Sequence, residues 1–192
     1  MSTPPPLRVN ALTMGEPAGI GGELTIKTWA NHRRSLTPFV ALDDADRLCA
    51  IAATLGLDVP IHVVETAAEA LNVFTDALPV ISLNASAQAT PGKPSPETAA
   101  AGEAGAIVTN PIQKDTLYAA GFKFPGHTEY LGDLDGGALP VMMLASPMLR
   151  VVPVTVHVPL RTALDTLSTE SIVTQGRMVI EALRRDFGVL AP

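Results

Sequence analysis

Short apolar runs of strand length alternate with segments of helical spacing along most of the chain. The runs typical of strands cover residues 7–13, 39–42, 61–64, 80–83 and 106–109, and two adjacent runs follow at 141–144 and 149–156. Helical spacing is found over 20–33, from about residue 45 to Gly56, over 113–120 and over 171–187. This alternation predicts a mainly parallel α/β sheet with helices covering both faces.

Local signals sharpen some of these boundaries. Asp43 or Asp44 is placed to cap the second helix, and Gly56 is placed to end it. Residues 85–98 are polar and rich in proline, which predicts a loop. Cys49 lies in an apolar stretch and is expected to be a buried structural thiol.

Composition excludes several classes of protein. The 192 residues are 47% hydrophobic, enough for a substantial core, and the net charge is −6. Basic residues cluster only as the pairs Arg33-Arg34 and Arg184-Arg185, which argues against nucleic acid as a partner. The sequence shows neither a membrane-length apolar stretch nor a secretory leader, and the single Cys49 excludes an internal disulfide or a thiolate metal cluster. A cytoplasmic protein without membrane contact is expected.

Closely spaced glycines occupy the turn between the first strand and the first helix, in the segment 13–22 (TMGEPAGIGG). Such glycines suit either a tight structural turn or a loop whose N–H groups, near Gly19 and Gly21, bind an anion. The spacing fits neither the dinucleotide fingerprint nor the Walker A loop.

Three further segments carry candidate chemistry. Lys114 follows a strand and opens a helix, and it is either a solvated lysine or a contact for a phosphate or carboxylate. In the segment 125–129 (PGHTE), His127 and Thr128 suit ligand binding, or Thr128 simply caps a helix beside an incidental histidine. His157 ends an apolar run, where a rim histidine and a metal ligand are both open interpretations.

Together these segments resemble the 4-hydroxythreonine-4-phosphate dehydrogenase family of vitamin B6 synthesis. Residues 13–21 (TMGEPAGIG) are similar to its N-terminal signature, 106–114 (AIVTNPIQK) to the second, 121–131 to the third and 155–161 (TVHVPLR) to the fourth. The four segments occur in the family's order, and the resemblance spans essentially the whole chain.

The resemblance implies an α/β fold like that of isocitrate and isopropylmalate dehydrogenases. It also implies a homodimer whose active sites lie between domains and subunits. The implied reaction is oxidation of 4-phosphooxy-L-threonine by NAD, or NADP, followed by decarboxylation to 3-amino-2-oxopropyl phosphate. By the same resemblance, His127 and Thr128 bind the phosphorylated substrate. His157 is then one of three histidine ligands of a divalent metal: zinc, magnesium or cobalt.

The chain also departs from the family pattern. Relative to that pattern, about twenty residues, one helix's worth, are absent near positions 101–102. Residues 1–192 correspond to the N-terminal and central parts of a two-domain dehydrogenase, without the family's C-terminal half. Two other activities therefore stay open: a sister dehydrogenase acting on phosphothreonate or phosphoerythronate, and a non-catalytic α/β remnant that binds an anion or a partner. An uncovered sheet edge and an uncovered face of the 171–187 helix predict association.

Overall fold

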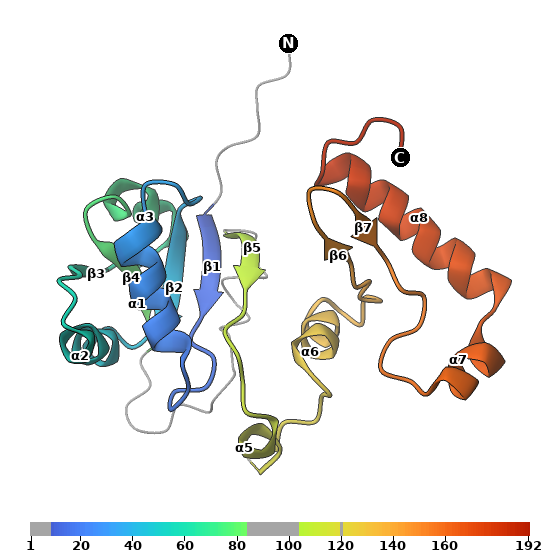
Figure 1. The fold of residues 1–192 in the computed structure, drawn as a ribbon, viewed down its shortest axis with the longest axis horizontal. Coiled ribbons are helices and arrows are strands. Elements are labelled where there is room, and N and C mark those ends of the chain that lie inside the picture. Colours follow the sequence, from blue (N-terminus) through green and yellow to red (C-terminus); the bar gives the residue numbers. More distant parts are fainter. Residues whose placement is uncertain (1–8, 84–103, 120) are drawn as a thin grey trace. The chain divides into compact units, whose positions relative to one another are not determined.

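A computed structural model describes residues 9–83, 104–119 and 121–192 (Figure 1). The chain forms two compact units, residues 1–136 and residues 137–192. No helix in the described part of the chain is long and apolar enough to cross a membrane. The predicted loop at 85–98 and the predicted gap near 101–102 lie outside the described residues.

The first unit is built on a parallel sheet, as the sequence predicts. Its described strands are β1 (Val9–Thr13), β2 (Phe39–Asp43), β3 (Ile61–Val63), β4 (Leu78–Ser82) and β5 (Ala104–Val108). Their spatial order is β3-β4-β2-β1-β5, and every pairing is parallel. The strands β3 and β5 therefore form the two edges.

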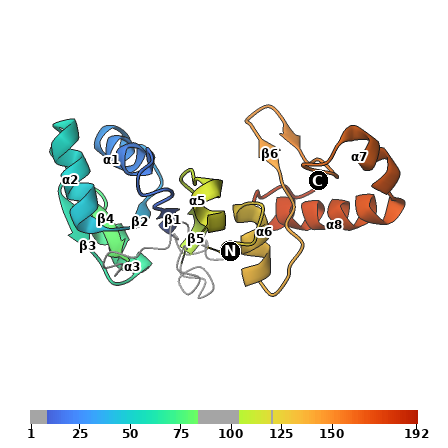
Figure 2. The ribbon, with the colours of Figure 1, turned by 90° about the horizontal axis from the view of Figure 1, so that it is seen from below.

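Helices lie on both faces of this sheet (Figure 2). Helices α1 (Gly21–His32) and α2 (Ala45–Leu55) pack on one face, and α3 (Ala67–Val73) packs on the other. Two buried clusters reflect the two faces: one joins α1 and α2 to the sheet, and the other joins α3 to Val9 and Val40.

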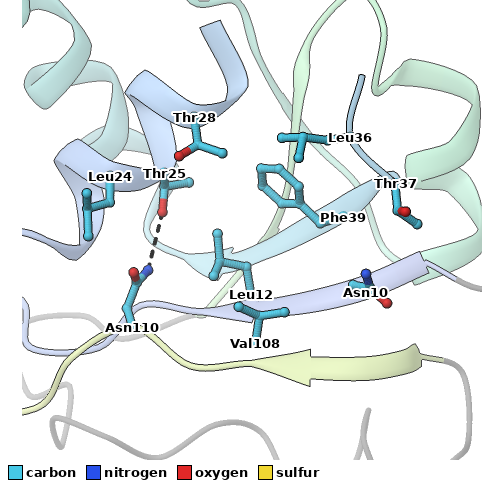
Figure 3. Close-up of a pocket in the computed structure, with 10 residues that line it drawn as sticks. All are labelled: Asn10, Leu12, Leu24, Thr25, Thr28, Leu36, Thr37, Phe39, Val108 and Asn110. Carbon is cyan, nitrogen blue, oxygen red and sulfur yellow. Dashed lines mark hydrogen bonds between the residues drawn. The ribbon is translucent and has the colours of Figure 1, made fainter. Parts of the chain in front are cut away.

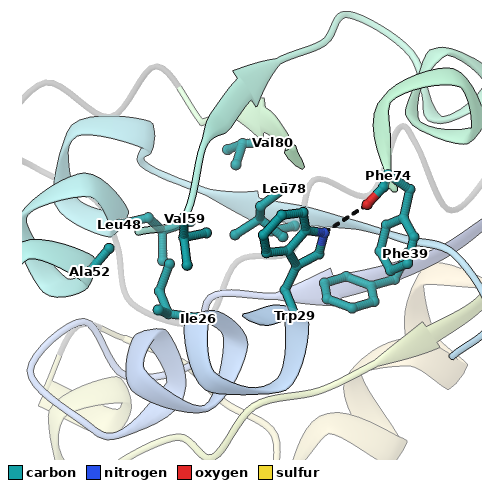
Figure 4. Packing of buried hydrophobic residues seen from close by; sticks show 10 residues of the cluster. Ile26, Trp29, Phe39, Leu48, Ala52, Val59, Phe74, Leu78 and Val80 are labelled. Atoms are coloured by element: carbon teal, nitrogen blue, oxygen red, sulfur yellow. Dashed lines mark hydrogen bonds between the residues drawn. The ribbon is translucent and has the colours of Figure 1, made fainter. Parts of the chain in front are cut away.

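The larger cluster is centred on Trp29, which is 2% exposed (Figure 4). The indole Nε1 donates a hydrogen bond to the Phe74 carbonyl at 2.8 Å, so the buried polar atom is satisfied. The rings of Phe39 and Phe74 meet edge to face with centroids 5.0 Å apart. Ile26 and Leu48, both fully buried, join the two helices to this core.

Capping signals account for the ends of α2 and the start of α3. Asp44 accepts a hydrogen bond from the Arg47 backbone N–H, and Gly56 ends α2 with a φ of 65°. Helix α3 was not predicted, although Thr66 and Glu69 form the Thr-x-x-Glu pattern of a capping box. The Thr66 hydroxyl accepts from the Glu69 N–H, and the Glu69 carboxylate accepts from the Glu65 N–H.

The prediction for Cys49 is wrong, because its side chain is exposed. Helix α2 directs Leu48 and Ala52 into the core, and the residue after Leu48 falls on the solvent side. An alanine-rich helix has too little contrast between its faces for the sequence alone to orient Cys49.

The first unit continues after β5 with two short helices, α5 (Lys114–Ala119) and α6 (His127–Leu134). The second unit contains β6 (Leu144–Ala145), β7 (Arg150–Val151), α7 (Leu160–Thr166) and α8 (Thr169–Arg185). The strands β6 and β7 form a two-residue antiparallel hairpin. The two adjacent strands predicted over 141–144 and 149–156 are thus confirmed as neighbours, but their predicted length is wrong, because prolines at 140, 147 and 153 interrupt this region. The final predicted helix is present as α8.

Candidate functional site

Two turns meet at the C-terminal ends of the strands in the first unit, which we call the carboxyl edge of the sheet. One follows β1 and contains the glycines; the other follows β5 and leads to Lys114. Strand β1 connects to β2 on one side, whereas β5 lies on its other side. In open parallel α/β sheets, ligands bind outside the carboxyl ends of the strands. The two turns therefore occupy the position where this fold places a ligand.

Asn110, which is 6% exposed, joins the two turns. Its side-chain Nδ2 donates to the Thr13 carbonyl at 2.8 Å. The same Nδ2 donates to the Thr25 Oγ1 at 3.3 Å (Figure 3). Its backbone N–H donates to the Thr13 Oγ1 at 3.2 Å. A single side chain thus ties the end of β1, the start of α1 and the segment after β5 together.

The glycines of the first turn allow this close approach. Gly15 has a φ of 72°, and a Cβ there would lie 2.6 Å from the Pro111 carbonyl oxygen. A Cβ on Gly21 would lie 2.5 Å from the Met14 carbonyl oxygen. Both positions need glycine for backbone packing alone, which favours the structural interpretation of the turn.

The contacts of Glu16, the acidic residue of the turn, also favour the structural interpretation. Glu16 Oε1 accepts from the Ala18 N–H at 3.3 Å, and the Gly19 N–H donates to the Glu16 carbonyl at 2.9 Å. A carboxylate beside these N–H groups disfavours a second negative charge. Anion contacts at Gly19 and Gly21 stay a prediction.

A buried ion pair fixes the other side of the glycine turn. Arg47 Nη1 lies 2.9 Å and 3.0 Å from the two carboxylate oxygens of Asp43, at the end of β2. Its Nη2 and Nε donate to the Pro17 carbonyl at 2.7 Å and 3.2 Å. Burial raises the pKa of the Asp43 carboxyl, and the Arg47 charge partly opposes that rise. Arg47 therefore tethers the turn to the sheet.

The second turn presents Lys114 at the carboxyl edge. Lys114 is the first residue of α5 and is exposed. The Pro111 carbonyl accepts from the Glu16 N–H at 2.8 Å, so the segment leading to Lys114 is anchored to the glycine turn. The Lys114 side chain is thus exposed to solvent, and the backbone that precedes it is held in place by hydrogen bonds.

His127 and Thr128 are the first two residues of α6. The N-cap is Gly126, so the interpretation of Thr128 as the capping residue is wrong. Partial burial lowers the pKa of His127, which favours the neutral imidazole near pH 7. Phe122, Phe124 and Tyr130 flank the start of this helix in sequence. Their rings contact one another at steep angles, edge to face or tilted, with centroids 5.3–5.5 Å apart.

His157 lies in the second unit, in an exposed bend before α7. The sequence placed it at the end of a strand, but β7 ends at Val151. His157 has a φ of 58°, an uncommon conformation for a residue with a side chain. Among the described residues, no group of three His, Cys, Asp or Glu side chains is placed to hold a metal ion. A catalytic metal usually needs three protein ligands, so these residues do not by themselves fit one.

A parallel sheet with helices on both faces, and with two turns joined at the ends of β1 and β5, defines a protein of the α/β class. Comparison with known proteins identifies the family. The model of the family described as "Pyridoxal phosphate biosynthetic protein PdxA" matches residues 34–192. The chain belongs to this family.

Individual relatives agree with this assignment. The 4-hydroxythreonine-4-phosphate dehydrogenase of Bradyrhizobium diazoefficiens is 45% identical over 95% of this chain and 60% of its own length. That of Caulobacter vibrioides is 40% identical over the same shares. The crystal structure of the Klebsiella pneumoniae 4-hydroxythreonine-4-phosphate dehydrogenase matches with a TM-score of 0.78 and 30% identity, covering 97% of this chain and 60% of that one.

The chain thus spans about 60% of the length of these relatives. The Bradyrhizobium alignment covers 208 positions, more than the 192 residues of this chain, so this chain carries gaps relative to that protein. The position of the gap near 101–102 stays a prediction.

Proposed function

We propose that the chain contributes to a 4-hydroxythreonine-4-phosphate dehydrogenase, which oxidises 4-phosphooxy-L-threonine with NAD or NADP. The secondary alcohol loses a hydride from carbon and a proton from oxygen, and the resulting β-keto acid releases CO₂ to give 3-amino-2-oxopropyl phosphate. The observation that carries the proposal is the 45% identity to a relative of that name over 95% of the chain.

The residues of this chain would bind and orient the substrate. The exposed Lys114 ammonium, held on the segment anchored by Asn110, suits the charge of a phosphate or carboxylate. The neutral imidazole of His127 and the hydroxyl of Thr128, at the start of α6, can donate or accept hydrogen bonds to the substrate's polar groups.

The cofactors of the proposed reaction need polypeptide beyond the described residues. A divalent metal (zinc, magnesium or cobalt) would take His157 as one ligand, but His157 has no partner ligands in the described part of the chain. The glycine turn is filled by the protein's own atoms, so it does not define a pocket for NAD. We therefore assign no step of the reaction to a metal or nicotinamide contact of this chain.

A homodimer with a shared active site is part of the proposal. It is supported by the second unit, in which every one of residues 137–192 is at least partly exposed. A unit of that size without buried side chains is stable only when another surface covers it.

Calorimetric titration of the chain with 4-phosphooxy-L-threonine tests the role of these residues. We expect saturable binding that Lys114→Gln, His127→Ala and Thr128→Ala each weaken by about tenfold, the loss of one charge-assisted or buried hydrogen bond. The matched control is His62→Ala, which changes an exposed histidine on the edge strand β3 and should leave the affinity unchanged. If all four variants bound the substrate as tightly as the parent chain, Lys114, His127 and Thr128 would have no role in substrate binding.

A further inference from the structure

Arg47 joins the glycine turn to β2 and α2 through both sides of its guanidinium. It is the third residue of α2, and its side chain is 19% exposed. Nη1 donates to the two carboxylate oxygens of Asp43, whereas Nη2 and Nε donate to the Pro17 carbonyl. Because a guanidinium is planar and its N–H donors are fixed, this contact holds Pro17 at one place relative to the end of β2.

The packing around α1 leaves space for this guanidinium. Gly22, the second residue of α1, is buried, and a Cβ there would lie 3.1 Å and 3.2 Å from Nη1 and Nη2 of Arg47. The same Cβ would lie 2.5 Å from Cδ1 of Ile51 on α2. A larger residue at position 22 would therefore displace Arg47, and Gly22 is matched to its present position.

The residue before Pro17 connects the glycine turn to the second turn. The Glu16 N–H donates to the Pro111 carbonyl at 2.8 Å. This bond lies between Asn110 and Lys114 along the chain, so it determines where the segment runs after its anchor at Asn110. A shift of the glycine turn would thus move the backbone that presents Lys114.

The position of that backbone matters because Lys114 is exposed and carries its charge on a long, flexible stem. Such a side chain binds an anion well only when its backbone places the ammonium within reach of the bound ligand. Arg47 does not supply that charge itself, since all three of its guanidinium nitrogens contact Asp43 or Pro17.

We infer that Arg47 is a positioning residue for the carboxyl edge. Through Pro17 and the glycine turn, it sets where Lys114 meets the phosphate or carboxylate of the substrate. The inference rests on the proposed function, because it requires Lys114 to contact an anionic group of the substrate.

A double-mutant cycle tests the inference by calorimetric titration with 4-phosphooxy-L-threonine. We expect Arg47→Met to weaken binding by about three- to tenfold in the parent chain, but by less than about twofold in the Lys114→Gln background. Arg47→Lys keeps a positive charge beside Asp43 and cannot reproduce the contact of three nitrogens. We therefore expect Arg47→Lys to weaken binding about as much as Arg47→Met.

Leu78→Ala is the control for a general loss of stability. Leu78 is fully buried and is the first residue of β4, at the opposite end of the sheet from the carboxyl edge. The cavity lowers stability, but the affinity of the folded chain should not change. All variants are titrated at a temperature at which circular dichroism shows them folded. Should the Arg47 variants fail to fold, Gly22→Ala replaces them in the cycle, because it displaces the guanidinium while leaving Arg47 in the chain.

The outcomes separate the inference from the proposed function. If Lys114→Gln weakens binding while the Arg47 variants bind like the parent, the inference is wrong and the proposed function stands. Recovery of the parent affinity by Arg47→Lys would show that charge alone matters, and an equal effect of Arg47→Met with and without Lys114 would show another route of action; either result overturns the inference. A loss of affinity in Leu78→Ala as large as that in Arg47→Met would do the same. If Lys114→Gln itself binds like the parent, the role of Lys114 in the proposed function fails, and the inference fails with it.

Discussion

At the scale of single residues, Asn110 and the glycines opposite it decide how closely the two turns at the carboxyl edge approach. Asn110 donates to Thr13 and Thr25, and Gly15 lets the Pro111 carbonyl come within 2.8 Å of the Glu16 nitrogen. The motif that carries the family resemblance is thus explained in large part by packing. Its glycines are needed for backbone packing, whether or not a ligand binds.

Gly15→Ala and Gly56→Ala separate steric crowding from backbone strain. Both glycines have positive φ, 72° and 65°, but an added Cβ meets the Pro111 carbonyl at 2.6 Å in the first case and nothing within 4 Å in the second. We expect Gly56→Ala to cost about 1–2 kcal/mol of unfolding free energy, the strain of a left-handed alanine. Gly15→Ala should cost clearly more, by about 1–3 kcal/mol for overpacking. Urea denaturation measures both, and equal losses would contradict the steric account.

His127 gives a pH-dependent signal of its own. Because burial lowers its pKa below the ordinary 6.5, the folded state binds fewer protons than the unfolded state between the two pKa values. Its contribution to stability is therefore present above pH 6.5 and is lost as the pH falls through the folded pKa. NMR titration should give a midpoint below 6.5 for His127, moving up to that value in urea. A folded midpoint at or above 6.5 would show that the imidazole is not desolvated.

At the scale of elements, the ion pair of Arg47 and Asp43 holds the glycine turn against β2 and α2. The Asp43 side chain is 2% exposed and that of Arg47 is 19% exposed. Removing one partner of such a pair leaves an uncompensated buried charge, which costs far more than losing an exposed pair. Lys27 and Glu23 on α1 form an exposed reference pair, because the two partners of each pair are four residues apart in the sequence.

Arg47→Met should lower the unfolding free energy by about 3 kcal/mol near pH 7. Burial already raises the pKa of Asp43, and loss of Arg47 raises it further, so the cost of ionising Asp43 is greatest at neutral pH. The loss should therefore shrink as the pH falls toward and below 3.8, where the carboxyl becomes protonated in both folded and unfolded states. Lys27→Met should cost less than about 0.5 kcal/mol at either pH. A similar, pH-independent loss for both variants would be inconsistent with a buried ion pair.

The elements that sequence patterns predict well are those with strong boundaries. Helix α1, the Asp44 and Gly56 ends of α2, and the five strands of the sheet are confirmed because apolar runs and caps agree there. The errors lie where the pattern is weak or interrupted: the orientation of Cys49 on an alanine-rich helix, and the length of the strands around Pro147 and Pro153. Helix α3 begins at a Thr-x-x-Glu capping pattern that is visible in the sequence, so its start is predictable although its short apolar spacing is not distinctive.

At the scale of the whole molecule, the chain combines a well-packed first unit with a second unit that has little interior. Ile172, Val173 and Ile180 on α8 are 40–47% exposed, which agrees with the predicted exposure of that helix face. The sequence could place the motifs in order and on the right turns. It could not show that Asn110 joins these turns, because the contacting residues are 85 and 97 positions apart. The sequence also does not predict the orientation of His157, because nothing in the neighbouring residues indicates its left-handed φ.

The central claim is that residues 1–192 carry the substrate-binding residues of a 4-hydroxythreonine-4-phosphate dehydrogenase. Turnover by a chimera, in which this chain replaces the matched region of the Bradyrhizobium relative, tests that claim most directly. NADH formation is followed with 4-phosphooxy-L-threonine and a divalent metal, in parallel with the His127→Ala and His62→Ala variants. We expect turnover that His127→Ala lowers by about a hundredfold or more and that His62→Ala leaves unchanged, since loss of a substrate-orienting group costs several kcal/mol of transition-state stabilisation. A folded chimera that forms no NADH, or one in which His127→Ala is as active as the parent, would contradict the account.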